Sequence, residues 1–210
     1  GATAIMALGT MGECATLSEN DYEAFVDCLL TTVRNRIPAF VGSTALGTHD
    51  IVRRIRFLKE RGAAGTLLGI PMWQPATVDM AVKFYASISE TFPDLPIMVY
   101  ANSRAFRFAF GLDFWKVIVE KAPTVMSSKF SNKAILVEAV AATKGRVNLI
   151  PPVGLAYTFA ELAPETTTTC WIHAVGPQPA IALMQAVAAR DWSRAKAVAE
   201  DIRWAVEPHH

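Results

Sequence analysis

The feature that most constrains this 210-residue chain is a strict alternation of short apolar, β-rich runs with segments of helical period. Each of seven strand candidates is followed by a stretch long enough for a helix. Such alternation requires a parallel sheet with right-handed crossovers, because a helix returns the chain to the same end of the sheet. The strand candidates span residues 2–9, 38–43, 65–71, 97–101, 125–129, 147–151 and 167–174.

Capping residues and apolar periodicity predict the helices between these strands. Ser18 followed by Asp21 is typical of a helix start. Thr48 can cap the next helix, and Gly62 is expected to end it in a left-handed conformation. Further helices are predicted from about Val78 onward and over 113–121, 132–144, 154–162, 177–189 and 191–206.

Seven strand–helix units are one short of a (β/α)₈ barrel, the TIM barrel of α/β proteins. We therefore predict that the first strand–helix unit of a barrel precedes residue 1. Residues 1–176 would then hold barrel strands 2 to 8, and residues 177–210 would form extra C-terminal helices that pack on the barrel. A doubly wound open sheet is the competing arrangement, but the chain has no glycine-rich phosphate motif to support it.

Composition indicates a globular protein that acts on a small molecule. Hydrophobic residues make up 52% of the chain, which can therefore bury a sizeable core. Lys and Arg total 20 against 19 for Asp and Glu, so charge gives no reason to expect nucleic acid or an anionic membrane as partner. The apolar stretches are far shorter than the roughly 20 residues of a membrane span, and no signal-peptide pattern opens the chain.

Cysteine and histidine usage gives no sign of a disulfide framework or a metal site. Cys14, Cys28 and Cys170 are widely spaced and have no histidine at metal-ligand spacing. This pattern fits a reducing compartment, so we expect a cytoplasmic protein. We expect neither a metal nor a dissociable cofactor.

One of the eight lysines lies at the end of an apolar strand. Lys129 ends strand 125–129, and active sites of parallel barrels are built at the C-terminal ends of strands. Partial burial there disfavours the ammonium form, and a neutral amine can attack a ketone carbonyl. The alternative is a lysine at the barrel mouth that pairs with a carboxylate.

Two other strand ends carry groups that could serve such an amine. Tyr100 lies near the end of strand 97–101, and adjacent parallel strands are about 5 Å apart, so its phenol can approach Lys129 and move protons. A half-buried tyrosine with a satisfied hydroxyl is the alternative. The turn Gly9–Glu13 can direct backbone N–H groups and the Thr10 hydroxyl at a carboxylate, or it is a simple strand-to-helix turn.

Three motifs together resemble one enzyme superfamily. GTMGECATLS (9–18), YANSRAF (100–106) and SSKF (127–130) are similar, in order and spacing, to the dihydrodipicolinate synthase and N-acetylneuraminate lyase superfamily of class I aldolases. The ECATL segment and GIPMW (69–73) most resemble hydratase-aldolases of aromatic-hydrocarbon degradation. Those enzymes act on trans-o-hydroxybenzylidenepyruvate in naphthalene pathways and on trans-2′-carboxybenzalpyruvate in phenanthrene pathways.

The resemblance, which covers essentially the whole chain, implies a role for each matching residue. Lys129 would form the Schiff base with the substrate, and Tyr100 would shuttle protons. Asn102 would orient water or a substrate oxygen. The turn that binds the substrate carboxylate would comprise Gly9, Thr10 and Met11.

The resemblance also implies which residues meet the aryl end of the substrate. Trp171 would shape the aryl pocket. Met72 and Trp73 stand where the synthases have paired tyrosines, which makes the site less polar, as an aryl group requires. Arg104 and Arg107 could bind an ortho carboxylate and so favour the carboxybenzal substrate, or they lie on a solvated loop or a subunit contact.

We therefore predict a lyase: a Schiff-base hydratase-aldolase that cleaves an aryl-substituted benzylidenepyruvate, with a lean toward trans-2′-carboxybenzalpyruvate, into an aromatic aldehyde and pyruvate. The covalent imine on Lys129 would replace any cofactor. Another pyruvate-dependent aldolase of the superfamily is the first alternative, and a non-catalytic barrel that binds a keto acid is the second. By resemblance the protein would be a homotetramer, with Trp73 at the position where a side chain enters the neighbouring subunit's site.

Overall fold

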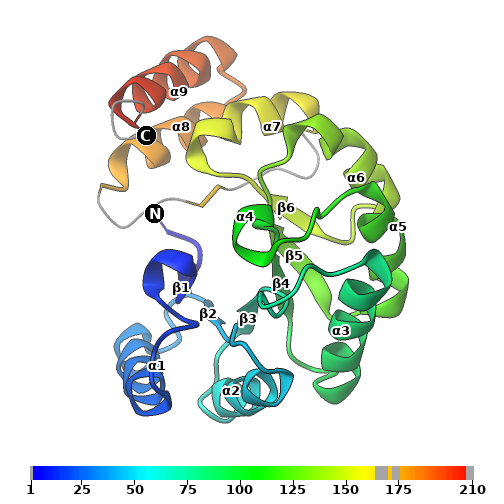
Figure 1. Ribbon diagram of the computed structural model, residues 1–210. Helices are drawn as coiled ribbons and strands as arrows, with labels where there is room; N and C mark the ends of the chain where they lie inside the picture. Colours follow the sequence, from blue (N-terminus) through cyan, green and yellow to red (C-terminus); the bar gives the residue numbers. More distant parts are fainter. Residues whose placement is uncertain (1, 164–169, 172–175, 207–210) are drawn as a thin grey trace. The chain divides into compact units, whose positions relative to one another are not determined.

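The computed structural model describes residues 2–163, 170–171 and 176–206, and the chain divides into two compact units, residues 1–126 and 127–210. In the first unit, parallel strands pair in chain order, and helices cover the outer side of these strands (Figure 1). The register places Phe40 opposite Met6 and Gly65 opposite Phe40. These strands are β1 (Ile5–Ala7), β2 (Ala39–Gly42), β3 (Gly65–Leu68) and β4 (Ile97–Tyr100).

Local sequence explains where the helices of this unit begin and end. Ser18 caps the first helix by accepting a hydrogen bond from the Asp21 N–H, as predicted. Gly62 has a φ of 78° just after the second helix, also as predicted. The predicted cap at Thr48 is wrong, because Gly47 holds the extended cap conformation and Thr48 is already helical. The helices are α1 (Glu19–Val33), α2 (Thr48–Glu60), α3 (Val78–Thr91), α4 (Ser103–Phe106) and α5 (Leu112–Lys121), with a 3₁₀ turn, η1 (Thr10–Gly12).

An aromatic cluster between α3 and α5 fixes the chain that follows β4. Phe114 lies edge to face with Tyr85, Phe108 and Phe110, with ring centroids 5.5–5.8 Å apart. The buried Trp115 indole donates to the Phe110 carbonyl at 3.0 Å. Edge-to-face pairs of this kind are favourable beyond the area they bury. The segment between β4 and α5 is therefore held by packing, although it contains little regular structure.

The second unit continues the strand–helix alternation. The last three residues of β5 (Val125–Lys129) pair in parallel with β6 (Asn148–Ile150). Most of the predicted strand 167–174 lies outside the described residues, but Trp171 within it forms a parallel bridge with Pro152. The helical elements are η2 (Lys133–Ile135), α6 (Leu136–Ala142), η3 (Val153–Leu155), α7 (Ala156–Leu162), α8 (Gln178–Ala188) and α9 (Trp192–Val206).

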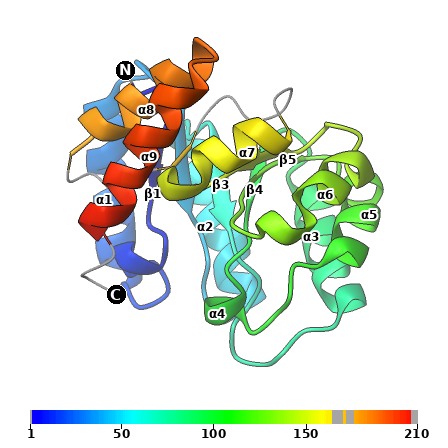
Figure 2. The ribbon, with the colours of Figure 1, turned by 90° about the horizontal axis from the view of Figure 1, so that it is seen from above.

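The two C-terminal helices form a layer on α7. Figure 2 shows α8 and α9 side by side. Their shared core with α7 contains Ala160, Leu183, Ala195 and Ile202, whose small and branched side chains allow close approach. Both helices were predicted within two residues of their ends, whereas the domain boundary after residue 176 remains a prediction.

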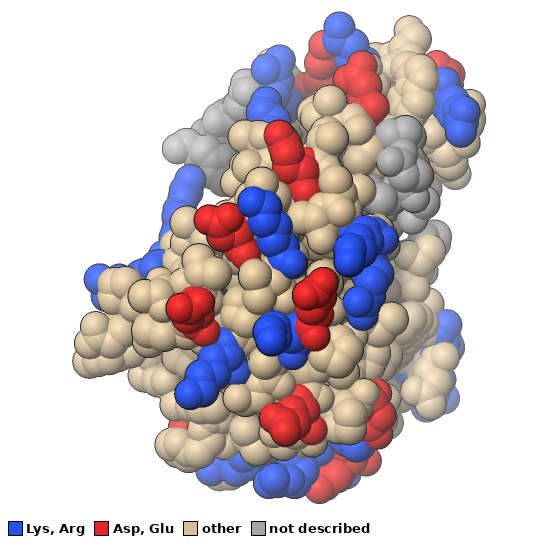
Figure 3. All heavy atoms as spheres, turned by 90° about the vertical axis from the view of Figure 1, so that its right-hand side faces the viewer, with Lys and Arg blue, Asp and Glu red and all other residues tan. Residues whose placement is uncertain are grey.

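The surface carries charge of both signs. On the face in Figure 3, acidic and basic side chains are interspersed rather than gathered into one patch. Within the described parts of the chain, no helix has both the length and the apolar character that crossing a bilayer would require.

Gly42 at the end of β2 admits the backbone of the segment that follows β1. An added Cβ there would lie 1.8 Å from the Leu8 carbonyl oxygen, which is backbone and cannot rotate away. We expect Gly42→Ala to lower the free energy of unfolding by roughly 1–3 kcal/mol in urea titrations. Gly154→Ala, where no atom lies within 4 Å of the added Cβ, should change it by less than about 1 kcal/mol. Equal effects of the two substitutions would contradict this packing argument.

Candidate active site

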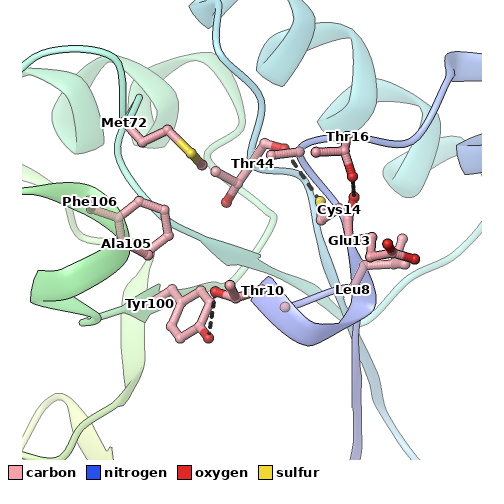
Figure 4. A pocket seen from close by; sticks show the side chains of 12 residues that line it. Leu8, Thr10, Glu13, Cys14, Thr16, Thr44, Met72, Tyr100, Ala105 and Phe106 are labelled. Carbon is pink, nitrogen blue, oxygen red and sulfur yellow. Dashed lines mark hydrogen bonds between the residues drawn. The ribbon is translucent and has the colours of Figure 1, made fainter.

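A cavity of about 380 Å³ lies in the first unit, where the C-terminal ends of its strands meet (Figure 4). Each strand supplies part of the wall, because all four run in the same direction. Leu8 to Thr10 follow β1, Thr44 follows β2, Met72 follows β3, and Tyr100 ends β4. The remaining lining residues are Glu13, Cys14, Ala15, Thr16, Ala105 and Phe106.

A hydrogen bond joins two predicted site residues across the cavity. The Thr10 hydroxyl donates to the Tyr100 phenol oxygen at 3.0 Å (Figure 4). Gly9 lies beside this hydrogen bond, where an added Cβ would be 3.7 Å from the same phenol oxygen, in ordinary van der Waals contact. Met11, in contrast, exposes 72% of its side chain and is not part of the cavity wall. The turn after β1 and the end of β4 therefore form one polar corner.

The turn that carries Thr10 is bounded by two residues in the left-handed region. Leu8 and Glu13 each have a φ of 56°, which is unfavourable for a residue with a side chain. The Leu8 side chain is buried in a core cluster with Tyr22, Val26 and Val41, and this packing holds its backbone in place. Strained backbone of this kind persists where the surrounding structure determines it.

The other side of the cavity is apolar. Phe106 lies edge to face with Tyr100, with ring centroids 5.3 Å apart, and Met72 lies above it (Figure 4). The Phe106 ring rests on the backbone of Gly69, where an added Cβ would lie 2.1 Å from the ring carbon Cζ. The Asn102 Oδ1 accepts from the Ala105 N–H at 3.2 Å and so starts the helix that presents Phe106.

Three further residues predicted for the site lie outside the wall of this cavity. Asn102 is half-buried and caps α4, while Arg104 is exposed. Trp73 exposes 71% of its side chain, and its carbonyl accepts from Arg107 Nη1 at 3.2 Å. Their roles toward a substrate remain predictions.

In the second unit, the structure brings Lys129 and Trp171 together. Lys129 ends β5, is half-buried, and holds its Nζ 3.8 Å from the centroid of the Trp171 ring. Backbone hydrogen bonds fix Trp171: its N–H donates to the Pro151 carbonyl at 2.9 Å, and its carbonyl accepts from the Val153 N–H at 3.1 Å. The indole thus covers one side of the amine.

Sequence reasoning missed the wall formed by Cys14 and Thr44. The Cys14 thiol donates to the Thr44 carbonyl at 3.3 Å, and burial raises the pKa of this thiol to about 11, against the opposing effect of Arg54. A signal was available: Thr44 follows a predicted strand by one residue, where barrel sites are built. Arg54 also falls on the apolar face of its helix, between Ile51 and Ile55.

We searched the described residues for side chains that could bind a metal ion together. Among residues 2–163, 170–171 and 176–206, no group of three or more His, Cys, Asp or Glu side chains could hold an ion. All three cysteines are free thiols.

Comparison with known proteins identifies relatives along the whole chain. The sequence model of the dihydrodipicolinate synthetase family matches residues 1–107. A trans-O-hydroxybenzylidenepyruvate hydratase-aldolase of Pseudomonas aeruginosa is 35% identical over 97% of this chain and 62% of its own length. A trans-2′-carboxybenzalpyruvate hydratase-aldolase of Nocardioides sp. (strain KP7) is 35% identical over 99% of this chain and 64% of its own. The chain thus spans less than two thirds of these relatives.

The chain is also similar in structure to a solved protein named PhdJ and to solved dihydrodipicolinate synthases. PhdJ bound to a substrate intermediate superposes with a TM-score of 0.94 at 34% identity, over 99% of this chain and 65% of that one. Dihydrodipicolinate synthase from Aquifex aeolicus superposes with a TM-score of 0.89 at 21% identity, over 99% and 71%. At this identity the second likeness shows the fold alone. It is the α/β fold of the synthases, a TIM barrel, and so favours the predicted barrel over the open sheet.

The contact of Phe106 with Gly69 predicts a coupled effect of substitution. Gly69→Ala should displace the ring and lower the free energy of unfolding by roughly 1–3 kcal/mol. Phe106→Leu removes the ring carbons that the new Cβ would meet. In urea titrations the double variant should be more stable than the sum of the two single effects predicts, by on the order of 1 kcal/mol. Strict additivity would contradict the contact.

Proposed function

The chain belongs to the dihydrodipicolinate synthetase family, and we propose that it is a Schiff-base hydratase-aldolase that cleaves an aryl-substituted benzylidenepyruvate into an aromatic aldehyde and pyruvate. The observation that carries this proposal is the hydrogen bond from Thr10 to Tyr100 in a cavity with one polar corner and one apolar side. Relatives at 35% identity that are named hydratase-aldolases support it.

The first step of the proposed reaction forms the imine. The Lys129 amine adds to the C2 ketone of the substrate to give a carbinolamine, which loses water. Tyr100 supplies and removes the protons that these two steps require, and Thr10 holds its phenol in place through the 3.0 Å hydrogen bond. The substrate carboxylate lies against the turn of Gly9, Thr10 and Met11, where backbone N–H groups can receive an anion.

The later steps use the imine as an electron sink. The protonated imine withdraws electrons through the conjugated double bond, so water adds at C4 and leaves an enamine. Protonation of this enamine at C3 restores the iminium before the next step. The C4 hydroxyl then loses its proton, the C3–C4 bond breaks, and its electron pair passes to the imine as an enamine while the aryl aldehyde leaves. Protonation at C3 and hydrolysis return pyruvate and the Lys129 amine. Substrate and one water therefore give aldehyde and pyruvate, with no redox change.

An aromatic face and an apolar surface would serve this chemistry. The Trp171 face, with its centroid 3.8 Å from Lys129 Nζ, can stabilise the cationic imine. Met72 and Phe106 would receive the aryl group on the apolar side of the cavity. Asn102 would orient the water that adds at C4.

The fold and the assembly of the full-length protein are also proposals. The chain spans 62% of the length of the Pseudomonas aeruginosa relative, and from its likeness in fold to PhdJ we propose that the whole protein is an eight-stranded barrel. We propose a cytoplasmic homotetramer in which Trp73, exposed in this chain, meets the neighbouring subunit.

Trapping with borohydride tests the nucleophile. Reduction in the presence of pyruvate should add a 1-carboxyethyl group to the peptide that contains Lys129, as seen by mass spectrometry. Lys129→Met should lose the adduct and lower kcat by about a thousandfold or more, since the covalent step disappears. Lys133→Met replaces an exposed lysine four residues further along the chain, and this variant should keep both the adduct on Lys129 and the wild-type kcat. An adduct on another lysine, or unchanged turnover in Lys129→Met, would refute the proposal.

The ortho substituent is tested by substituting Arg104. If this guanidinium binds a carboxylate, Arg104→Gln should lower kcat/KM for trans-2′-carboxybenzalpyruvate about tenfold or more, because a charged hydrogen bond is lost. The same variant should change kcat/KM for trans-o-hydroxybenzylidenepyruvate by less than about twofold. Equal changes for both substrates would exclude Arg104 as the carboxylate-binding group. Pyruvate release from neither substrate would favour another aldolase of the family.

A further inference from the structure

Arg54 in the middle of α2 is a buried cation with an unusual set of partners. Only 2% of its surface is exposed, and its sole carboxylate partner among the described residues is Glu19, with Nη2 and Nε at 2.8 and 3.1 Å from Oε1. The guanidinium lies 4.4 Å from the centroid of the Tyr22 ring. A charge is retained in such a place only when its hydrogen bonds are satisfied.

The other hydrogen bonds of Arg54 go to backbone carbonyls near the cavity and, from Nη1, to the Cys14 sulfur at 3.8 Å. Nη1 donates to the Cys14 carbonyl at 2.7 Å and to the Thr44 carbonyl at 2.9 Å, and Nη2 donates to the Leu17 carbonyl at 3.2 Å. Cys14 and Thr44 both line the cavity, whereas Arg54 does not. One guanidinium therefore ties the segment after β1 to the segment after β2.

The contacts of Thr44 continue toward the side of the cavity that Tyr100 lines. The Thr44 hydroxyl accepts from the Gly69 N–H at 3.0 Å, and Gly69 is the residue on which the Phe106 ring rests. Thr44 is thus fixed by its carbonyl on one side and by its hydroxyl on the other. Loss of the Arg54 contact would leave two buried carbonyls without this donor and would free Thr44 to move against the cavity.

We propose that Arg54 is a positioning residue that holds in place the cavity wall formed by Cys14 and Thr44, and thereby sets the fit of the aryl end of the substrate. This inference rests on the proposed function only for its kinetic consequence. Planar bidentate donation suits arginine and not lysine, whose ammonium cannot reach both carbonyls and the carboxylate in the same geometry.

Arg53 offers a matched control on the same helix. It is half exposed and also pairs with Glu19, at 3.1 Å, and with Asp50, at 3.2 Å. Arg53 has the same charge as Arg54 and shares its carboxylate partner Glu19, but neither Glu19 nor Asp50 lines the cavity. Effects that follow from a lost surface charge or from a weakened Glu19 should therefore appear in R53M as well.

The kinetic test compares R54K and R54M with R53M. R54K should raise KM for the benzylidenepyruvates about tenfold or more, since displacement of a cavity wall weakens aryl binding, while kcat falls less. R53M should keep KM within about twofold. The adduct of pyruvate with Lys129 after borohydride should form in R54K, because pyruvate lacks the aryl group. An unchanged KM in R54K, or the same rise in R53M, would overturn the proposal.

A second readout does not depend on turnover. Cys14 is 3% exposed, whereas Cys28 is exposed and serves as an internal standard. N-ethylmaleimide followed by peptide mapping at pH 8 should leave Cys14 unmodified in the wild type and in R53M, and should label it in R54K. Should R54M fail to fold, E19Q keeps the arginine and should show the same labelling to a smaller extent. Equal protection of Cys14 in all variants would contradict the positioning role.

The two readouts separate this inference from the proposed function. If the wild type cleaves no benzylidenepyruvate, the proposed function fails, and labelling of Cys14 still decides whether Arg54 holds the cavity wall. If the wild type is active and R54K is indistinguishable from it by both measurements, the proposed function stands and the positioning role is wrong.

Discussion

Parallel strands place all of their C-terminal ends at one edge, and the candidate site depends on that constraint. Residues far apart in the sequence, such as Thr10 and Tyr100, meet because β1 and β4 run in the same direction within one sheet. The helices that return the chain lie on the outer side and leave this edge to short connecting segments. Such edges are where parallel α/β proteins assemble their sites.

The backbone conformation of the connecting segments is fixed because buried groups contact them. Leu8 adopts a left-handed backbone since its side chain belongs to the core, and Gly42 leaves room for its carbonyl. The guanidinium of Arg54 binds the carbonyls of Cys14 and Thr44 from behind the cavity. A hydrophobic core and a buried charge therefore contact the backbone of the segments that line the cavity.

Much of this could be predicted from the sequence, and the omissions have physical reasons. Strand periodicity located β1 to β6, and the position of Tyr100 at a strand end indicated a site residue. Thr48 was misassigned because a threonine before a helix resembles a cap, while the dihedral angles place the cap at Gly47. The Cys14–Thr44 wall was missed although Thr44 directly follows a predicted strand, because the groups that bind Arg54 there are backbone carbonyls, which every residue has. Arg54 was missed because most arginines are solvated, although its place between Ile51 and Ile55 indicates the buried face of the helix.

Our central proposal is that the Lys129 amine and the Thr10–Tyr100 corner act on one substrate. A crystal structure of the chain after incubation with pyruvate tests it most directly. The account predicts continuous density from Lys129 Nζ to the pyruvyl C2, the carboxylate against the turn of Gly9, Thr10 and Met11, and the Tyr100 hydroxyl within about 3 Å of the imine. Pyruvate bound without a bond to Lys129, or with its carboxylate away from that turn, would contradict it.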